Sequence, residues 1–274
     1  MLTSRRISTF GRLVLLLALL VFALLPIVWI VLTSFKNRLD VFAVPPKLIF
    51  TPQFGSYVKI FNDPAVVDKL VNSLLIAGLS VTLTLALSSL AAYSFSRFSF
   101  AGRSQLLIGI LATRLMPPVT AVIPLFILFQ GWGLIDTHLG LILIYSALNI
   151  PLATWMMKSF FDSVPRELEE SARIDGTTWF GALWRVTLPL AAPGIAATSV
   201  FIFTLAWNEF MFAFIFTSRN ARTLPALLAE TLGELQIYWS DMAALSTLIM
   251  IPPLLFSFYM QRRLVAGLQT GALK

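Results

Sequence analysis

Residues 161–190 read FDSVPRELEESARIDGTTWFGALWRVTLPL. Pro165 favours a helix start, and the charged residues after it predict a polar helix. Gly176 predicts a break, and the aromatic-rich stretch from Trp179 predicts a second short helix that ends at Pro189. Apolar side chains on the second helix of such a long connection are typical of a surface that docks on another protein. The alternative is an amphipathic segment resting on lipid. We call residues 161–190 the elbow segment.

On both sides of the elbow segment the chain is unusually apolar. Hydrophobic residues make up 58% of the sequence and charged residues 12%, about half the soluble average. The charges are clustered and leave uncharged runs of about 20 residues, the length of helix that crosses a bilayer. The composition therefore excludes a soluble domain and predicts an integral membrane protein.

Six apolar runs predict six membrane-spanning helices: Leu13–Phe35, Leu70–Ser96, Gln105–Gln130, His138–Met157, Leu190–Ser218 and Met242–Gln261. The first run is too long for a signal peptide and lacks a small-residue cleavage site, so we expect it to be retained. Pro117 and Pro118 predict a break in the third helix. The expected organisation is 1–35 (cytoplasmic N-terminus and first span), 36–69 (external loop), 70–265 (transmembrane core) and 262–274 (cytoplasmic tail).

The distribution of positive charge predicts the orientation. With six spans both termini share one side, where twelve Lys and Arg residues lie, against seven on the other side. The positive-inside rule then places both termini and the elbow segment in the cytoplasm. The net charge of +7 fits basic loops against anionic lipid better than a nucleic-acid partner. Cysteine is absent and His138 is the single histidine, so no disulfide or metal site is expected.

The spacing within the elbow segment is that of a known motif. Glu170-Ser171-Ala172 is followed by three residues, Gly176, nine residues, and Val186-Thr187-Leu188-Pro189. This pattern resembles the EAA loop of ABC importer permeases, here placed at 159–189, with Ser171 in place of Ala and Val186 in place of Ile. Residues 114–118 (RLMPP) and 207–210 (WNEF) are similar to the sugar-importer branch. The ending 267–274 (GLQTGALK) resembles the tail of the smaller of the two permeases in maltose-type importers.

The resemblance implies a type I ABC importer permease fold, all-α with six transmembrane helices, in a bacterial or archaeal cell (inner) membrane. It implies contact between the ATPase and Glu170, Ser171, Ala172, Gly176, Val186, Leu188 and Pro189, and a further contact through Gln269, Thr270 and Gly271. Glu169, about 100° further round its helix, is expected to matter less than Glu170.

The same resemblance implies the partners: a homologous second permease, an ATPase dimer and an extracellular sugar-binding protein. The sequence contains no G-x-x-x-x-G-K-[ST] motif, so we expect ATP and Mg²⁺ on the ATPase, no cofactor on this chain, and a transport subunit instead of an enzyme. The expected substrate is a di- or oligosaccharide such as maltose or trehalose, with a glycerol phosphate as the alternative.

Four polar or aromatic residues lie within apolar surroundings: Arg114, Trp207, Asn208 and Glu209. An unpaired charge facing lipid is costly, so Arg114 and Glu209 should line the translocation pathway or form structural pairs and caps. Asn208 and Trp207 could bind a sugar, although Trp is also common at the membrane interface.

A self-contained secondary transporter or channel is the second hypothesis. Such a protein needs its own coupling sites, typically several intramembrane acids and often an inverted repeat. Glu209 alone is weak support for it, and the elbow segment would have no purpose in it.

Overall fold

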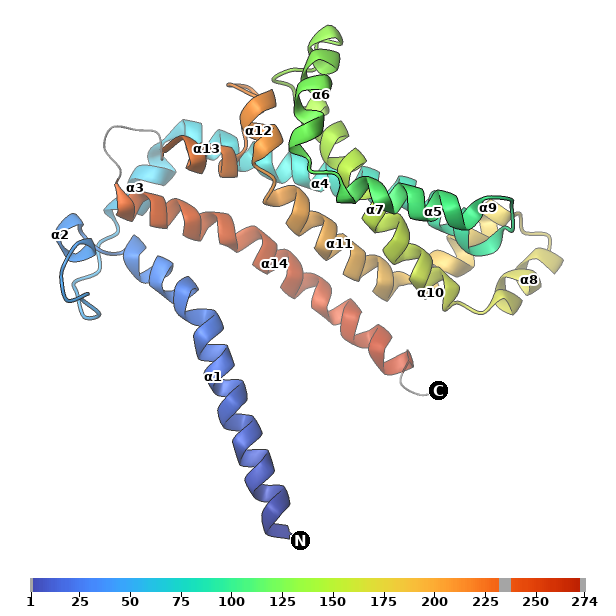
Figure 1. Cartoon of the computed structure of the whole chain (residues 1–274), viewed down its shortest axis with the longest axis horizontal. Coiled ribbons are helices and arrows are strands. Elements are labelled where there is room, and N and C mark those ends of the chain that lie inside the picture. The colour runs from blue at the N-terminus through green and yellow to red at the C-terminus, as the bar shows by residue number, and fades with distance from the viewer. Residues whose placement is uncertain (1, 232–237, 272–274) are drawn as a thin grey trace. The chain divides into compact units, whose positions relative to one another are not determined.

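The computed structural model describes the backbone of residues 2–231 and 238–271 and the side chains of residues 11–231 and 238–261. Throughout these residues the regular elements are helices (Figure 1). In chain order they are α1 (Leu2–Ser34), α2 (Arg38–Val41), α3 (Gly55–Asn62), α4 (Pro64–Arg97), α5 (Arg103–Ala112), η1 (Thr113–Leu115), α6 (Val119–Gly131), α7 (His138–Asp162), α8 (Arg166–Ile174), α9 (Trp179–Ala182), the π-helix η2 (Leu183–Thr187), α10 (Leu188–Leu190), α11 (Ala192–Trp207), α12 (Met211–Phe216), α13 (Leu224–Thr231) and α14 (Trp239–Gly271).

The long apolar helices agree with the predicted spans. Four helices of the described part of the chain are long and apolar enough to cross a membrane, and two bent helix pairs raise the total to six if each pair is one span. The first bent pair, Arg103–Leu115 with Val119–Gly131, turns by 96° at the predicted proline break. Pro117 and Pro118 lie in that break, where each lacks the N–H that a continuing helix needs.

The predicted fifth span departs from a single helix. The helix that ends at Trp207 is followed by a break, and α12 begins only at Met211. The predicted span Leu190–Ser218 is therefore interrupted at residues 208–210, where neither Gly nor Pro marks the break.

The chain forms two compact units. The first comprises Met1–Val67 with Leu228–Ile251. Within it, the Ser34 and Tyr57 hydroxyls lie 2.7 Å apart, and the Ser240 hydroxyl donates to the Lys36 carbonyl at 2.7 Å. Lys59 pairs with Asp241 at 2.6 Å. These bonds join the end of α1 to α3, and they join both α3 and the loop after α1 to the first turn of α14.

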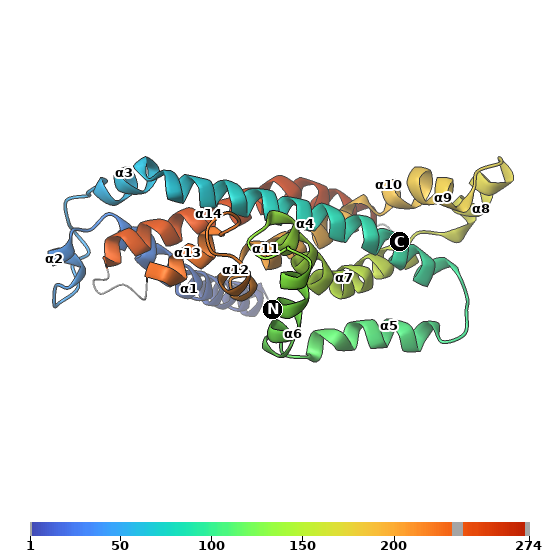
Figure 2. The ribbon, with the colours of Figure 1, turned by 90° about the horizontal axis from the view of Figure 1, so that it is seen from above.

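The second unit comprises Asp68–Leu227 with Pro252–Lys274. Small polar residues of α4 allow close packing on α7: the Ser80 and Ser88 hydroxyls donate to the Ile142 and Ile150 carbonyls at 3.5 and 3.3 Å. Gly194 of α11 lies against the ring of Phe160 on α7. The C-terminal end of α4, which is predicted to be cytoplasmic, lies beside the helices of the elbow segment in both views (Figures 1 and 2).

Candidate functional site

The elbow segment begins with α8, a short and strongly polar helix. Its first turn holds Glu167 and Glu169, whose negative charges favour the helix N-terminus. The helix ends in a Schellman motif: the Gly176 N–H donates to the Arg173 carbonyl at 3.0 Å, and the Thr177 N–H donates to the Ala172 carbonyl at 3.1 Å. Gly176 has a φ of +89°, a backbone conformation that residues with a Cβ rarely adopt. The predicted break at Gly176 is confirmed.

The second half of the elbow segment folds back onto the first. The Thr178 hydroxyl caps α9 by accepting from the Gly181 N–H at 3.1 Å. The guanidinium of Arg173 lies 3.8 Å from the centre of the Trp179 ring, which also packs edge-on against Phe98 at 5.1 Å. Leu183 is buried, whereas the apolar side chains of Phe180 and Trp184 are exposed. These contacts hold the two halves of the elbow segment together, and apolar side chains remain on its outer surface.

An ion pair lies buried beneath the elbow segment. The Glu169 side chain accepts from Arg97 at 2.8 Å, from the Thr187 hydroxyl at 2.7 Å and from the Tyr93 hydroxyl at 3.0 Å. Burial opposes ionisation of Glu169, but the hydrogen bonds and the positive charge of Arg97 outweigh it and lower the pKa of this carboxyl. Glu169 therefore belongs to the packed interior and does not face water.

The residues of the predicted motif lie mainly on the outer side of the elbow segment. Glu170, Ser171, Gly176 and Pro189 are exposed, and Ala172, Val186 and Leu188 are half-buried. Glu170 directly follows Glu169 in α8, yet its side chain is exposed whereas that of Glu169 is buried. A partner that contacts α8 therefore meets Glu170 and not Glu169.

Arg114 lies in η1, just before the break at residues 116–118, and Glu209 lies in the break between α11 and α12. The Arg114 guanidinium donates to the Leu148 carbonyl of α7 at 3.1 Å and is otherwise exposed. The Glu209 carboxylate accepts from the Phe212 and Ala213 N–H groups at 3.1 and 3.3 Å. Glu209 therefore caps α12, which matches the alternative that treated these charges as structural.

Trp207 and Asn208 differ in exposure. Trp207 is 2% exposed and stacks on Phe203, with ring centres 5.7 Å apart. Asn208 is exposed, and its amide donates back to the Thr204 carbonyl at 2.8 Å. Of the four predicted pathway residues, Arg114 and Asn208 present accessible polar groups in this conformation, whereas Trp207 belongs to the packed interior.

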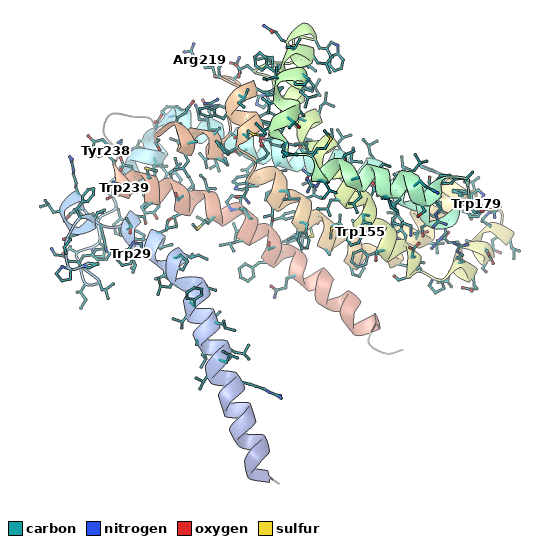
Figure 3. The ribbon with its side chains drawn as sticks, viewed as in Figure 1. Trp29, Trp155, Trp179, Arg219, Tyr238 and Trp239 are labelled. Carbon is teal, nitrogen blue, oxygen red and sulfur yellow. The ribbon has the colours of Figure 1, made fainter. Side chains whose placement is uncertain are left out.

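A carboxylate clasp holds the loop after α12. Asp136 has a φ of +56°, and its carboxylate accepts from the N–H groups of Ser218, Arg219, Asn220 and Ala221 at 3.0 to 3.3 Å. Burial opposes ionisation of Asp136, but these backbone bonds outweigh it and lower its pKa to about 2. Figure 3 shows Arg219 of this loop and Trp179 of the elbow segment in widely separated parts of the second unit.

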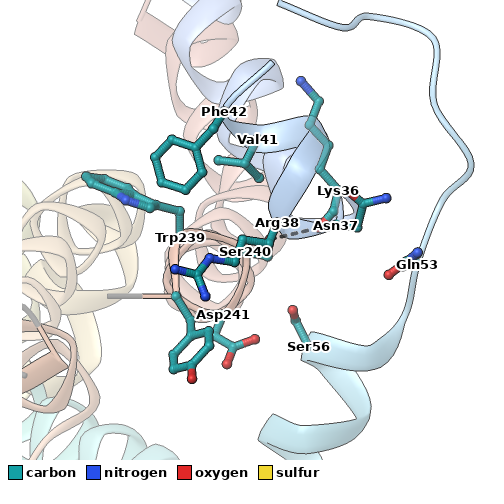
Figure 4. Close-up of a pocket in the computed structure, with 11 residues that line it drawn as sticks. Lys36, Asn37, Arg38, Val41, Phe42, Gln53, Ser56, Trp239, Ser240 and Asp241 are labelled. Carbon is teal, nitrogen blue, oxygen red and sulfur yellow. Dashed lines mark hydrogen bonds between the residues drawn. The ribbon is translucent and has the colours of Figure 1, made fainter. Parts of the chain in front are cut away.

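The first unit contains a pocket of about 200 Å³ beside the first turn of α14 (Figure 4). Asn37, Arg38, Ser56, Trp239 and Asp241 contribute to its lining. Sites that enclose a drug-sized ligand usually occupy about 300–1,000 Å³. This pocket is thus too small to enclose a disaccharide and is an indentation in the surface of the loops.

Comparison with known proteins identifies the family. Residues 84–270, which include the whole elbow segment, match the family described as the binding-protein-dependent transport system inner membrane component. The chain belongs to this family. It is therefore a permease component of a membrane transport system.

The permease is similar to several named relatives over nearly its whole length. It is 38% identical to the sulfoquinovosyl glycerol transport system permease protein of Agrobacterium fabrum, covering 93% of this chain and 90% of the relative. It is 35% identical to the trehalose/maltose transport system permease protein of Thermococcus litoralis, over 93% and 92% of the two chains. The trehalose transport system permease protein of Mycobacterium tuberculosis is 36% identical, over 92% and 93%.

The fold of the permease is also that of a solved transporter. A chain from the crystal structure of a bacterial ABC transporter involved in the import of the acidic polysaccharide alginate superposes with a TM-score of 0.78 at 23% identity. The match covers 94% of the permease and 97% of that chain. The prediction of an all-α, six-span ABC importer permease fold is confirmed.

Sequence reasoning missed three side chains around Glu169, two of them on α4, and one side chain that holds a loop. Arg97, Tyr93 and Thr187 surround Glu169, and Asp136 holds residues 218–221. The position of Arg97 at the end of an apolar helix suggests that it has a polar partner, but the sequence does not identify that partner, which lies 72 residues away. Gln269, Thr270 and Gly271, predicted to contact the ATPase, are described only as backbone at the end of α14.

Proposed function

We propose that the permease is one of two homologous membrane subunits of an ATP-driven sugar importer. It forms half of the translocation pathway, and a separate ATPase supplies the energy. The family and the relatives, two of which are named as transporting trehalose, support this proposal. A di- or oligosaccharide is the proposed substrate class, and a glycerol phosphate is the alternative.

The shape of the elbow segment carries the proposal. Ile174 at the end of α8 is 87% exposed, and Phe180 and Trp184 on the second helix are 60% and 59% exposed. Large apolar side chains grouped on a fixed, otherwise polar helix pair are typical of a protein-binding surface. We assign this surface, with Glu170, to contact with the ATPase. ATP-driven closure of the ATPase would then move the elbow segment and the spans joined to it.

The opposite ends of the spans would face an extracellular sugar-binding protein. In the proposed orientation the termini and the elbow segment are cytoplasmic, so the loop held by Asp136 and the pocket beside Trp239 lie outside. A solved transporter of the same fold was crystallised with a periplasmic protein bound to an alginate pentasaccharide, which supports a partner of this kind. Arg114 and Asn208 are the proposed pathway residues.

Transport by the reconstituted complex tests the proposal. The permease, its second permease, the ATPase and the binding protein would be placed in proteoliposomes with labelled trehalose, maltose or glycerol phosphate. The proposal predicts uptake that requires ATP and every component. Uptake by the permease alone, without ATP, would instead support the secondary transporter hypothesis.

A further inference from the structure

Arg97 connects the end of a membrane span to the elbow segment through several bonds. Its guanidinium lies 2.7 Å from the Glu169 carboxylate and donates to the Phe161 and Val164 carbonyls at 3.0 and 3.1 Å. It also donates to the Ser96 hydroxyl at 2.9 Å. Phe161 lies in the last turn of α7 and Val164 in the link to α8, so one side chain of α4 holds the end of α7, this link and α8.

Glu169 extends the same network to the second half of the elbow segment. Its Oε1 accepts from Arg97 and from Thr187, and its Oε2 accepts from Tyr93. Thr187 is the last residue of the π-helix η2, and Tyr93 lies one turn before Arg97 on α4. Single-turn π-helices occur frequently at functional sites. Four helical elements, α4, α7, α8 and η2, therefore meet at this ion pair.

The ion pair is costly to bury and contributes little net stability. The side chains of Arg97 and Glu169 are 3% and 2% exposed, so both charges have lost their water. Apolar residues of similar volume often stabilise a core equally well or better, whereas removal of one partner leaves an uncompensated buried charge. Beside this pair lies an apolar cluster that includes Phe161, Val164 and Leu183, so the surroundings would accommodate apolar packing.

We propose that Arg97 and Glu169 form a rigid joint through which movement of the elbow segment is passed to the membrane spans. The pair locks α8 to the end of α4 and to the end of α7, so that these elements move as one body. Arg97 and Glu169 are thus positioning residues that act behind the ATPase-contacting surface. This inference rests on the proposed function, because it assigns the pair to coupling.

The first test separates coupling from assembly. In the reconstituted complex, Glu169→Gln keeps the side-chain shape but leaves Arg97 without its counter-charge. We expect the ATPase to co-purify as with the wild type, while sugar transported per ATP hydrolysed falls by about fivefold or more, within the usual range of coupling between sites. Glu167→Gln, on the same helix but exposed, is the matched control and should leave this ratio unchanged.

Thr187→Val covers the case in which Glu169→Gln fails to assemble. Valine matches threonine in shape and removes only the hydroxyl bond to Glu169, so the complex should assemble with a smaller loss of coupling. A normal transport ratio in both variants, or in Thr187→Val when Glu169→Gln does not assemble, would overturn the joint. If the wild-type complex itself shows no ATP-driven transport, the proposed function fails instead.

A distance measurement tests the joint directly. The permease has no cysteine, so Leu90→Cys on α4 and Leu168→Cys on α8 give two unique spin-label sites, both exposed. In the complex with wild-type Arg97 and Glu169, the distance between the labels should be the same with and without a non-hydrolysable ATP analogue. With Glu169→Gln it should shift or broaden between the two states. A nucleotide-dependent distance with Arg97 and Glu169 intact would refute the joint.

Discussion

Glu169 and Glu170 are neighbours in α8, but Glu169 is bonded to the buried Arg97 while Glu170 is exposed. A helix turns by about 100° per residue, so adjacent acids face different surroundings. Glu169 therefore serves the interior of the permease, and Glu170 is available to a partner. Glu169→Ala is consequently unsuitable as a control for Glu170→Ala, because it is itself expected to be destabilising: it leaves Arg97 buried without a counter-charge.

Glu170→Ala should weaken attachment of the ATPase. A charge-assisted hydrogen bond in a subunit contact contributes about 1.5–3 kcal/mol, whereas an exposed acid in contact only with water contributes little. Affinity of the detergent-purified permease complex for the ATPase would be measured by titration. Glu167→Ala, also exposed on α8, is the control. Equal losses in the two variants would mean that Glu170 makes no specific contact.

Gly176→Val should uncouple ATP hydrolysis from transport without preventing membrane insertion. A Cβ at Gly176 would meet no atom within 4 Å, so the penalty comes from the φ of +89° alone. A β-branched residue tolerates this region poorly, whereas asparagine adopts it more readily. Sugar-stimulated ATPase activity should fall in Gly176→Val and be largely kept in Gly176→Asn. Equal activity of the two variants would contradict a role for the backbone conformation.

Gly194→Ala should destabilise the packing of α11 on α7. A Cβ at Gly194 would overlap the ring of Phe160, which packs against the core beneath the elbow segment. Overpacking of this kind costs about 1–3 kcal/mol. Thermal unfolding in detergent should show a lower Tm for Gly194→Ala, and adding Phe160→Ala should reduce the penalty specific to Gly194. Additive losses in the double variant would show that the two residues do not compete for space.

Asp136→Asn should show a pH-dependent loss of stability. Its folded-state pKa of about 2 lies below the unfolded value of about 3.9, so ionised Asp136 stabilises the fold above pH 4. Asparagine also tolerates the positive φ, and we expect a loss of about 1 kcal/mol at neutral pH after solvent screening.

The stability gap between wild type and Asp136→Asn should shrink as the pH falls from about 4 to about 2. Thermal unfolding across this range checks it, with the exposed Asp68→Asn as the control. A gap that is constant with pH would rule out the carboxylate charge as its cause.

Local chemistry made much of the fold predictable. Pro117 and Pro118 identified the broken third span because proline lacks a donor, and Gly176 identified the end of α8 because glycine favours positive φ. The break after Trp207 was not predictable in this way. There the Glu209 carboxylate caps α12 after a turn that contains neither Gly nor Pro.

The buried part of the site depends on contacts distant in sequence. Two adjacent acids in a polar helix carry no mark of which one is buried, and only the position of Arg97 on another span decides it. Asp136 likewise reaches residues more than 80 positions away. The sequence pattern therefore identified the outer surface of the elbow segment, whereas the groups that hold it became visible only with the packing of the spans.

Cross-linking from the elbow segment tests the central claim most directly. Single cysteines at Ile174 and at Arg219, both exposed, would carry a photoactivatable cross-linker in the assembled complex. The proposed function predicts that Ile174→Cys cross-links to the ATPase and that Arg219→Cys, on the outer side, does not. Cross-linking of the ATPase through Arg219→Cys but not through Ile174→Cys would contradict both the docking surface and the proposed orientation of the permease.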